Sequence, residues 1–320
     1  MEELTHMKCL VTGAAGFVGS TLSEKLLELG HEVIGVDCFT DYYDVEIKRA
    51  NIKSALGSSG YNFIEADLLD VDLSKLLAGV DWVFHQAAQP GVRMSWGSFF
   101  DVYTRNNILA TQRLLEAAKE SSIRRLVYAS SSSVYGDSPD LPLKETARPQ
   151  PISPYGVTKL AAEHLCYLYF VNYGVPTTSL RYFTVYGPRQ RPDMGFHKFI
   201  KSALNGEEIV IFGDGEQTRD FTYIADAVAA NIQAAGADGA EGRVFNIGGG
   251  SRISVNAVMD ILIGLIGQIN VRHIEDQKGD VRHTMSDTTA AREILGYAPK
   301  VDIKEGLARE VEWMKELLGK

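Results

Sequence analysis

The sequence contains one tyrosine and lysine pair whose spacing could support proton transfer, Tyr155 and Lys159. Ser153 is a favourable N-cap residue and Pro154 suits the first helical position, so we predict a helix over residues 153–173. Side chains four residues apart leave the same face of a helix. A phenol beside an ammonium group ionises below its free pKa of about 10, so Tyr155 could act as a base near neutral pH.

The spacing alone does not make the pair catalytic. The chain has 14 Tyr in 320 residues, and chance predicts about 0.7 Tyr–Lys pairs at this spacing, so two exposed helical side chains are an equal interpretation. Position favours chemistry, because an apolar strand over residues 125–129 runs into four consecutive serines before the helix. Ligands bind at the carboxyl ends of parallel strands. Ser131 is therefore expected to join the pair, the alternative being an ordinary polar loop.

A glycine-rich turn near the start of the chain predicts a dinucleotide site. A short strand over residues 8–11 is followed by a turn that contains Gly13, Gly16, Phe17, Val18 and Gly19, and then by an amphipathic helix. The first glycine permits a tight turn, the second lets the backbone approach a pyrophosphate, and the third lets the helix pack closely on the sheet.

An acidic residue follows at the spacing that such a site requires. Asp37 ends the second predicted strand, 18 residues after the third glycine. Its carboxylate could accept hydrogen bonds from an adenosine ribose and would repel a 2′-phosphate, which predicts NAD rather than NADP. The alternative is a solvated strand end.

Further strand ends supply the rest of the predicted cofactor pocket. A third strand, over residues 62–67, ends at Asp67, which with Leu68 could flank the adenine. A fourth strand ends in Ala87 and Ala88, whose small side chains leave room for the dinucleotide. His85 in the same strand is interpreted as a satisfied structural histidine.

The alternation of apolar strands and helices predicts an α/β fold with a doubly wound parallel (Rossmann) sheet. A long helix is expected from about 98 to 121, with Asn106 directed inward. We predict an NAD-binding domain over residues 1–180, to which 223–248 return, and a smaller α/β substrate domain over 181–320. Within the second domain we expect a short hairpin or loop after 209–212 and a mostly helical tail after 254.

Composition limits the classes of function. The net charge is −9, and no run of lysine or arginine offers a stripe for nucleic acid. Cys9, Cys38 and Cys166 show no spacing typical of metal ligands or disulfide frameworks. Neither a signal peptide nor a membrane-spanning apolar run is apparent. These features predict a cytoplasmic enzyme without a metal.

Several stretches resemble the nucleotide-sugar epimerases of the extended short-chain dehydrogenase/reductase family. Gln217-x-Arg219-Asp220 joins the glycine turn and the Ser131, Tyr155 and Lys159 set in this resemblance, which covers nearly the whole chain. The stretches 41–45 (DYYDV), 87–93 (AAQPGVR) and 191–194 (RPDM) are most similar to UDP-glucuronate 4-epimerases.

The resemblance implies roles for individual residues. It implies a bound NAD, Tyr155 as base, Lys159 on the nicotinamide ribose, and Ser131 on the substrate hydroxyl. It also implies a homodimer formed by helices near 98–121 and 154–173. The implied nucleotide-sugar contacts are Gln89, Arg93, Ser131, Ser132, Ser133, Thr184, Arg191, Arg219, Asp280 and Arg282.

Three of these contacts carry specific expectations. Arg219 is the preferred diphosphate contact, because a guanidinium suits phosphate oxygens. Asp280 would contact the uridine ribose by resemblance. Relatives often carry Arg where this chain has Gln277, so Arg282 is expected to take that phosphate role. Arg191 could bind the substrate, the diphosphate or a surface partner.

The implied reaction is transient oxidation of the sugar at C4 by NAD, followed by reduction on the opposite face. For a uronate the 4-keto intermediate can lose CO₂, so Ser131, Ser132, Ser133 and Thr184 are expected to restrain the carboxylate. Related dehydratases carry an Asp-Glu pair at 132–133, and decarboxylases carry Glu at 133, whereas this chain carries serine. The alternatives are a UDP-glucose 4-epimerase, a UDP-glucuronate decarboxylase and a non-catalytic NAD-binding protein. The sequence does not distinguish a UDP-linked from a dTDP-linked sugar as the substrate.

Overall fold

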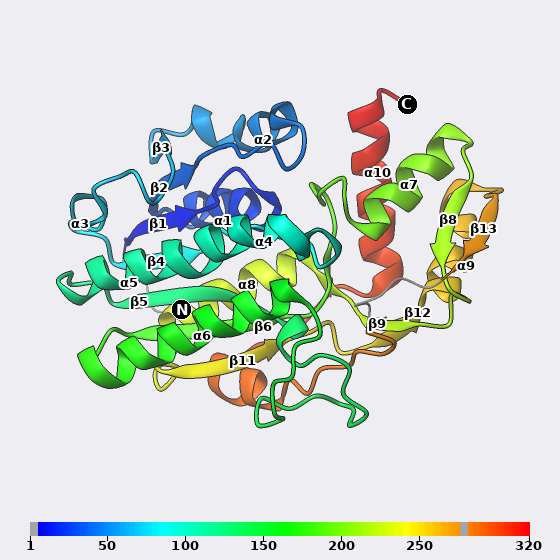
Figure 1. Ribbon diagram of the computed structural model, residues 1–320. Helices are drawn as coiled ribbons and strands as arrows, with labels where there is room; N and C mark the ends of the chain where they lie inside the picture. Colours follow the sequence, from blue (N-terminus) through cyan, green and yellow to red (C-terminus); the bar gives the residue numbers. More distant parts are fainter. Residues whose placement is uncertain (1–5, 276–280) are drawn as a thin grey trace.

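The computed structural model describes residues 6–275 and 281–320, and its centre is a parallel sheet of seven strands (Figure 1). In spatial order the strands are β11 (Arg243–Ile247), β6 (Thr177–Tyr182), β5 (Arg125–Ser131), β4 (Trp82–His85), β1 (Lys8–Thr12), β2 (Glu32–Asp37) and β3 (Tyr61–Glu65). All neighbouring strands pair in parallel. The predicted doubly wound fold is confirmed, and the order of the strands reverses between β1 and β4, where such folds bind ligands.

Helices cover both faces of this sheet. They are α1 (Phe17–Glu28), α2 (Val45–Ile52), α3 (Leu73–Leu76), α4 (Phe100–Tyr103), α5 (Ala110–Lys119), α6 (Pro154–Tyr173) and α8 (Ile224–Gly236). Alternate residues of one strand enter two separate cores, so that Val11 of β1 packs in the cluster with α1 and α8, and Leu10 packs in the cluster with α5 and α6. Because side chains alternate across a strand, burial of both sets explains why the strands are almost continuously apolar.

The predicted helix over 98–121 is interrupted. A single 3₁₀ turn, Gly97–Phe99, leads into α4, a π-helical segment over Thr104–Leu109 follows, and α5 ends at Lys119. π-helical turns are rare and often occur at functional sites. In this segment, Asn107 is buried. Its side-chain oxygen accepts from the backbone N–H of Gln89, and its side-chain nitrogen donates to the backbone carbonyl of Gln89.

The second half of the chain adds three small two-stranded sheets. Its remaining elements are β7 (Val185–Tyr186), α7 (Gly195–Asn205), β8 (Ile209–Phe212), β9 (Thr218–Asp220), β10 (Thr222–Tyr223), β12 (Arg252–Ser254), α9 (Val255–Ile266), β13 (Val271–Ile274), a π-helical turn (Ala291–Leu295) and α10 (Ile303–Leu318). Of the hairpin or loop expected after β8, the structure contains the loop, because β8 pairs in parallel with β13 and β9 pairs with β12. The tail after 254 is less helical than predicted, because it contains β13.

Among the described residues, none of the helices is both long enough and apolar enough to cross a membrane.

Candidate functional site

A pocket lies at the carboxyl ends of the central strands of the sheet. Fifteen of the residues expected in the site line it, although they come from segments far apart in the sequence. They are Gly13, Gly16, Phe17, Val18, Gly19, Asp37, Asp67, Leu68, Ala87, Ala88, Gln89, Asn106, Tyr155, Lys159 and Arg191. The structure therefore brings the predicted dinucleotide residues and the Tyr–Lys pair into one space.

The glycine turn after β1 has no room for side chains. Gly13 has a φ of +68°, and a Cβ there would lie 2.8 Å from the backbone nitrogen of Ala87. A Cβ on Gly19 would lie 2.1 Å from the carbonyl oxygen of Gly13. The turn leads directly into α1, so it places backbone N–H groups at a helix N-terminus beside the pocket, as an anionic ligand requires.

Asp37 has a structural as well as a possible binding role. Its carboxylate accepts hydrogen bonds from the backbone N–H groups of Ala15, at 3.2 Å, and Phe39, at 2.8 Å. Lys48 Nζ lies 3.7 Å from the same carboxylate. The side chain thus fixes the glycine turn to the end of β2 while it lines the pocket. Farther along, Asp67 pairs with Arg105 at 2.6 Å.

Tyr155 lies at the start of α6, where the sequence predicted it. Ser153 accepts a hydrogen bond from the N–H of Gly156 at 3.1 Å, which confirms the predicted N-cap. The hydroxyl of Ser131 lies beside the phenol of Tyr155 and lowers its pKa. Its ring meets that of Tyr103 edge-on, with 6.3 Å between centroids.

The structure corrects the expectation that Lys159 lowers the pKa of Tyr155. Burial raises the pKa of Tyr155 above its ordinary value, and the influences that lower the pKa are the charge of Arg191 and the hydroxyl of Ser131. Burial lowers the pKa of Lys159 to about 7. Its ammonium lies 4.8 Å from the centre of the Tyr128 ring. Arg191, far along the chain, is therefore the cation that acts on the phenol in this structure.

The four serines at the end of β5 and in the turn after it separate into two groups. Ser130 donates to Glu163 at 2.7 Å, and Glu163 forms a buried ion pair with Arg181. Ser131 instead accepts from the backbone N–H of Ser133 at 3.1 Å and faces Tyr155. The end of β5 thus forms the start of the polar loop, and Glu163 of α6 holds it in place through Ser130. Ser132 and Ser133 are half-buried in the short turn that follows.

Other expected contacts lie away from the residues that line this pocket. Arg93 stacks on the ring of Phe212, with 4.3 Å to its centre. The guanidinium of Arg219 donates to the backbone carbonyls of Thr218 and Arg282. Arg282 itself pairs with Asp214 at 2.7 Å.

Two further positions complete the comparison with the sequence. The carbonyl of Thr184 accepts from the N–H of Thr222, and its side chain is half-buried. Asp280, like Gln277, lies outside the described residues.

Several pocket residues had no predicted site role. Tyr42, Tyr43 and Lys48 follow β2, and Gln86 and Tyr182 end β4 and β6. Tyr42 and Tyr43 belong to the stretch 41–45, whose sequence is similar to that of UDP-glucuronate 4-epimerases. Its local sequence does not indicate that the two side chains face the pocket. His85 is fully buried between Thr12 and Thr111, which confirms the structural interpretation. Over residues 6–275 and 281–320, His, Cys, Asp and Glu form no group that could hold a metal ion.

Comparisons with known proteins agree with this geometry. A UDP-glucuronate 4-epimerase of Thermodesulfobacterium geofontis is 41% identical over 96% of this chain and 96% of its own length. An uncharacterized UDP-glucose epimerase of Bacillus subtilis is 46% identical over 97% of this chain and 99% of its own. The crystal structure of UDP-glucuronic acid 4-epimerase from Bacillus cereus with UDP-glucuronic acid and NAD superimposes with a TM-score of 0.95, at 44% identity, covering 97% of this chain and 100% of the other. The model of the NAD dependent epimerase/dehydratase family matches residues 9–248, so the chain belongs to that family.

Proposed function

We propose that this protein interconverts UDP-glucuronate and UDP-galacturonate by epimerisation at C4, with NAD bound in the pocket. The observation that carries the proposal is the convergence of the glycine turn, Asp37 and the Tyr155 and Lys159 pair on one pocket. Relatives that are UDP-glucuronate 4-epimerases support the choice of substrate.

The residues present fit a dinucleotide. In the glycine turn, a Cβ on Gly13 or Gly19 would collide with the backbone. The turn lies at the N-terminus of α1, which suits a pyrophosphate. We expect Asp37 to accept from the adenosine ribose and Lys159 to reach the nicotinamide ribose. The other expected contacts are Gly13, Gly16, Phe17, Val18, Gly19, Asp67, Leu68, Ala87, Ala88, Asn106 and Tyr155. When bound, NAD supplies reversible oxidation and reduction at the sugar carbon.

The chain's own groups move the proton. The Oη of Tyr155 takes the proton of the sugar 4-hydroxyl and later returns it. Ser131, which lies beside that phenol, hydrogen-bonds the same hydroxyl and orients it. Because burial favours the neutral phenol, the charge of Arg191 stabilises the phenolate when the proton is transferred.

The substrate carboxylate needs restraint of another kind. A carboxylate beta to a ketone loses CO₂ when the bond to it lies parallel to the carbonyl π orbitals. We propose that Ser132, Ser133 and Thr184 hold it away from that alignment through neutral hydroxyls. The remaining proposed sugar-nucleotide contacts are Gln89, Arg93, Arg191, Arg219, Asp280 and Arg282.

A panel of nucleotide sugars tests the proposal. The purified protein is incubated with UDP- and dTDP-linked hexoses and uronates, without added NAD, and the products are resolved. We expect UDP-glucuronate and UDP-galacturonate to interconvert, and Tyr155→Phe to abolish the conversion while NAD stays bound. Turnover of Tyr155→Phe near the wild-type rate would contradict the role of the phenol.

A UDP-glucose 4-epimerase is the second candidate, since a relative from Mycolicibacterium smegmatis, 38% identical, carries that description. Comparison of kcat/KM for UDP-glucose and UDP-glucuronate separates the two, and a higher value for UDP-glucose would favour this alternative.

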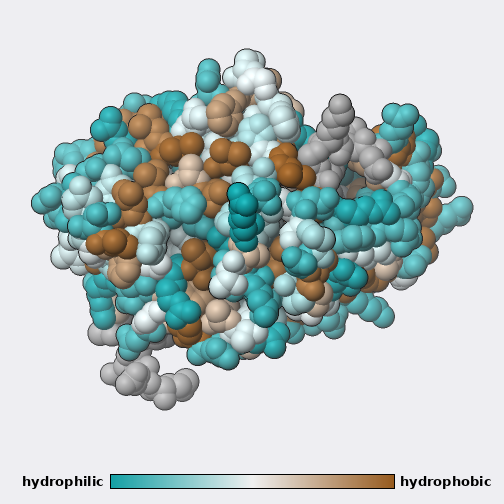
Figure 2. All heavy atoms as spheres, turned by 60° about the horizontal axis from the view of Figure 1, so that its bottom comes forward, coloured by the Kyte–Doolittle hydropathy of each residue, from teal (hydrophilic) through white to brown (hydrophobic). Residues whose placement is uncertain are grey.

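We further propose a cytoplasmic homodimer. Large apolar side chains are exposed on α6, among them Val157, Leu168 and Val171, and others lie on α4 and the turn before it. Figure 2 shows apolar residues gathered in the left half of the molecule, where these helices lie in Figure 1. The three cysteines are free, which suits a reducing compartment. The division into domains 1–180, with 223–248, and 181–320 remains our proposal.

A further inference from the structure

The loop between β7 and α7, residues 187–194, crosses from the second half of the chain to the pocket, and we call it the strap. It is anchored at several points. The N–H of Gly187 donates to Glu310 of α10 at 2.9 Å. Arg189 has a φ of +71°, a conformation unfavourable for a residue with a side chain, and pairs with Glu24 of α1 at 2.8 Å. The strap is therefore held in one path against the first half of the chain.

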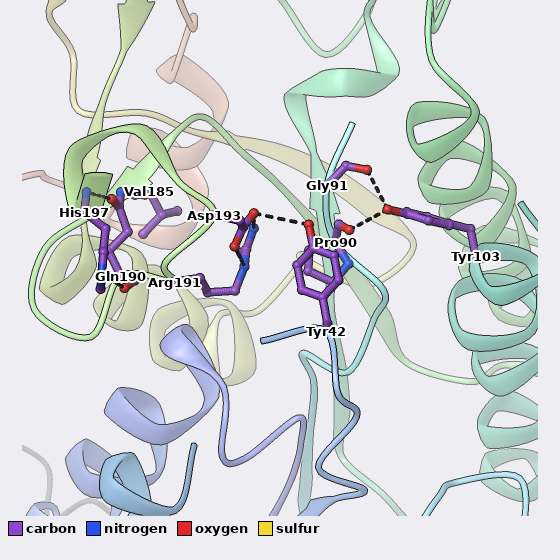
Figure 3. A network of polar contacts seen from close by, with 9 residues as sticks. All are labelled: Tyr42, Pro90, Gly91, Tyr103, Val185, Gln190, Arg191, Asp193 and His197. Carbon is purple, nitrogen blue, oxygen red and sulfur yellow. Dashed lines mark hydrogen bonds and ion pairs between the residues drawn. The ribbon is translucent and has the colours of Figure 1, made fainter. Parts of the chain in front are cut away.

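Asp193 is the residue of the strap that links two parts of the pocket lining. Arg191 binds its carboxylate with two nitrogens, Nε and Nη2, both at 3.0 Å. The hydroxyl of Tyr42 donates to the same carboxylate at 3.3 Å. Figure 3 shows Asp193 between these two side chains. Arg191 and Tyr42 both line the pocket, although they lie in opposite halves of the sequence.

The segment that carries Tyr42 is itself firmly placed. A Cβ on Gly91 would lie 2.4 Å from the Tyr42 hydroxyl, so only glycine leaves room for it there. The carbonyls of Pro90 and Gly91 accept from the hydroxyl of Tyr103, at 2.7 and 2.8 Å (Figure 3). Tyr42 thus lies between a fixed turn on one side and the carboxylate of Asp193 on the other.

We propose that Asp193 is a positioning residue that closes the cofactor pocket, because it fastens Tyr42 to Arg191 and so slows the release of the dinucleotide. This inference rests on the proposed function. A dinucleotide bound from Asp37 to Tyr155 would occupy the pocket that Tyr42 and Arg191 line, so the bonded segments would cover it. Its departure requires these two segments to separate, and their separation breaks the bond between Tyr42 and Asp193.

Two variants weaken the link from Tyr42 through Asp193 to Arg191 with little change in shape. Tyr42→Phe deletes only the donor hydroxyl, and Asp193→Asn removes the charge that binds Arg191. Tyr61→Phe is the matched control, since Tyr61 lies on β3 outside the residues that line the pocket, and among the described residues its hydroxyl has no hydrogen-bond partner. Unfolding temperatures of the NAD-free proteins show whether each variant keeps its fold.

Release is measured on the NAD-loaded proteins. Each is diluted into alcohol dehydrogenase and ethanol, which reduce only free NAD, and the NADH formed is followed by absorbance. We expect Tyr42→Phe and Asp193→Asn to release NAD about tenfold faster than wild type, the change that corresponds to ~1.4 kcal/mol. Tyr61→Phe is expected to release NAD at the wild-type rate.

The other outcomes overturn the inference. Wild-type release from both Tyr42→Phe and Asp193→Asn would show that the bond does not hold the pocket closed. Equally fast release from Tyr61→Phe would show that loss of a tyrosine hydroxyl outside the pocket has the same effect, so that the bond between Tyr42 and Asp193 is not what slows release. A wild-type protein that neither contains nor takes up NAD would instead refute the proposed function, and the inference would fail with it.

Discussion

At Tyr155 and Lys159, burial acts on two groups of opposite charge and favours the neutral form of both. It raises the pKa of the phenol and lowers that of the ammonium to about 7. A buried phenol such as that of Tyr155 gives up its proton, and so becomes a base, only when a positive charge is close. Arg191 provides such a charge from the strap. The reactive state of Tyr155 therefore depends on a residue that lies far from it in the sequence.

Lys159 makes the stability of the protein depend on pH. The unfolded chain keeps this lysine protonated up to its ordinary pKa of 10.5, whereas the folded chain binds the proton only below about 7. Between these values the unfolded state binds more protons, so the free energy of unfolding should rise with pH, by at most about 1.4 kcal/mol per unit. Urea denaturation of NAD-free wild type and Lys159→Met between about pH 7 and 9 tests this, since the variant lacks the group. Parallel slopes for the two proteins would contradict it.

The hydroxyls proposed to restrain the substrate carboxylate give a prediction about products. Ser133→Ala or Thr184→Val should let the 4-keto intermediate reach the alignment that expels CO₂, so the fraction of UDP-4-keto-pentose should rise. Chromatography of the reaction mixture measures it. Ser121→Ala is the control, because the Ser121 hydroxyl only donates to Ala118 at the end of α5. Unchanged product purity in both variants would count against the restraint.

Residues whose role follows from local geometry could be predicted from the sequence. Gly13 and Asp37 occupy a strand, turn and helix pattern that fixes where each must lie. Tyr42 and Arg191 could not be placed beside each other in this way, because the link between them is the carboxylate of Asp193 in a loop with no regular pattern. For the same reason the sequence suggested Lys159 as the cation beside the phenol, although the structure gives this role to Arg191.

At the scale of elements, the π-helical segment between α4 and α5 organises the floor of the pocket. Asn107 is 1% exposed, and its amide accepts from the N–H of Gln89 at 2.6 Å. It also donates to the carbonyl of Gln89 and to the hydroxyl of Thr158 on α6. One side chain thus ties the loop after β4 to the helix of Tyr155. A periodic apolar pattern predicts a helix here but carries no information about a wider turn.

Loss of this amide should be costly. Asn107→Leu leaves the buried N–H and carbonyl of Gln89 without partners, so the free energy of unfolding should fall by about 2–4 kcal/mol. Asn172→Ala, on the exposed side of α6, removes one bond to a solvated carbonyl and should change it by less than about 0.5 kcal/mol. Urea denaturation measures both values. Equal effects of the two substitutions would mean that Asn107 does not brace the loop.

At the scale of the whole molecule, the predictable part is the doubly wound sheet and the unpredictable part is the second half. Because the central strands are buried on both faces, they can be recognised in the sequence as apolar runs. β13 reads Val-Arg-His-Ile and is mostly exposed, so its parallel pairing with β8 leaves little trace in the sequence. The contacts that join the halves, such as Tyr135 with Asn246 at 2.7 Å, are equally non-local.

The exposed apolar face of α6 gives the prediction that concerns the assembly. Leu168 and Val171 lie three residues apart on that helix, 48% and 58% exposed, so both occupy one face that a second copy of the chain would cover. Each large apolar side chain buried there contributes about 1.5–3 kcal/mol. A charge in its place should therefore weaken a dimer by more than about tenfold in Kd. We expect wild type to scatter light as a dimer and Leu168→Glu to dissociate at micromolar concentration, whereas Leu317→Glu, at an equally exposed leucine on α10, should remain dimeric. A monomeric wild type, or the same dissociation in both variants, would place the interface elsewhere or remove it.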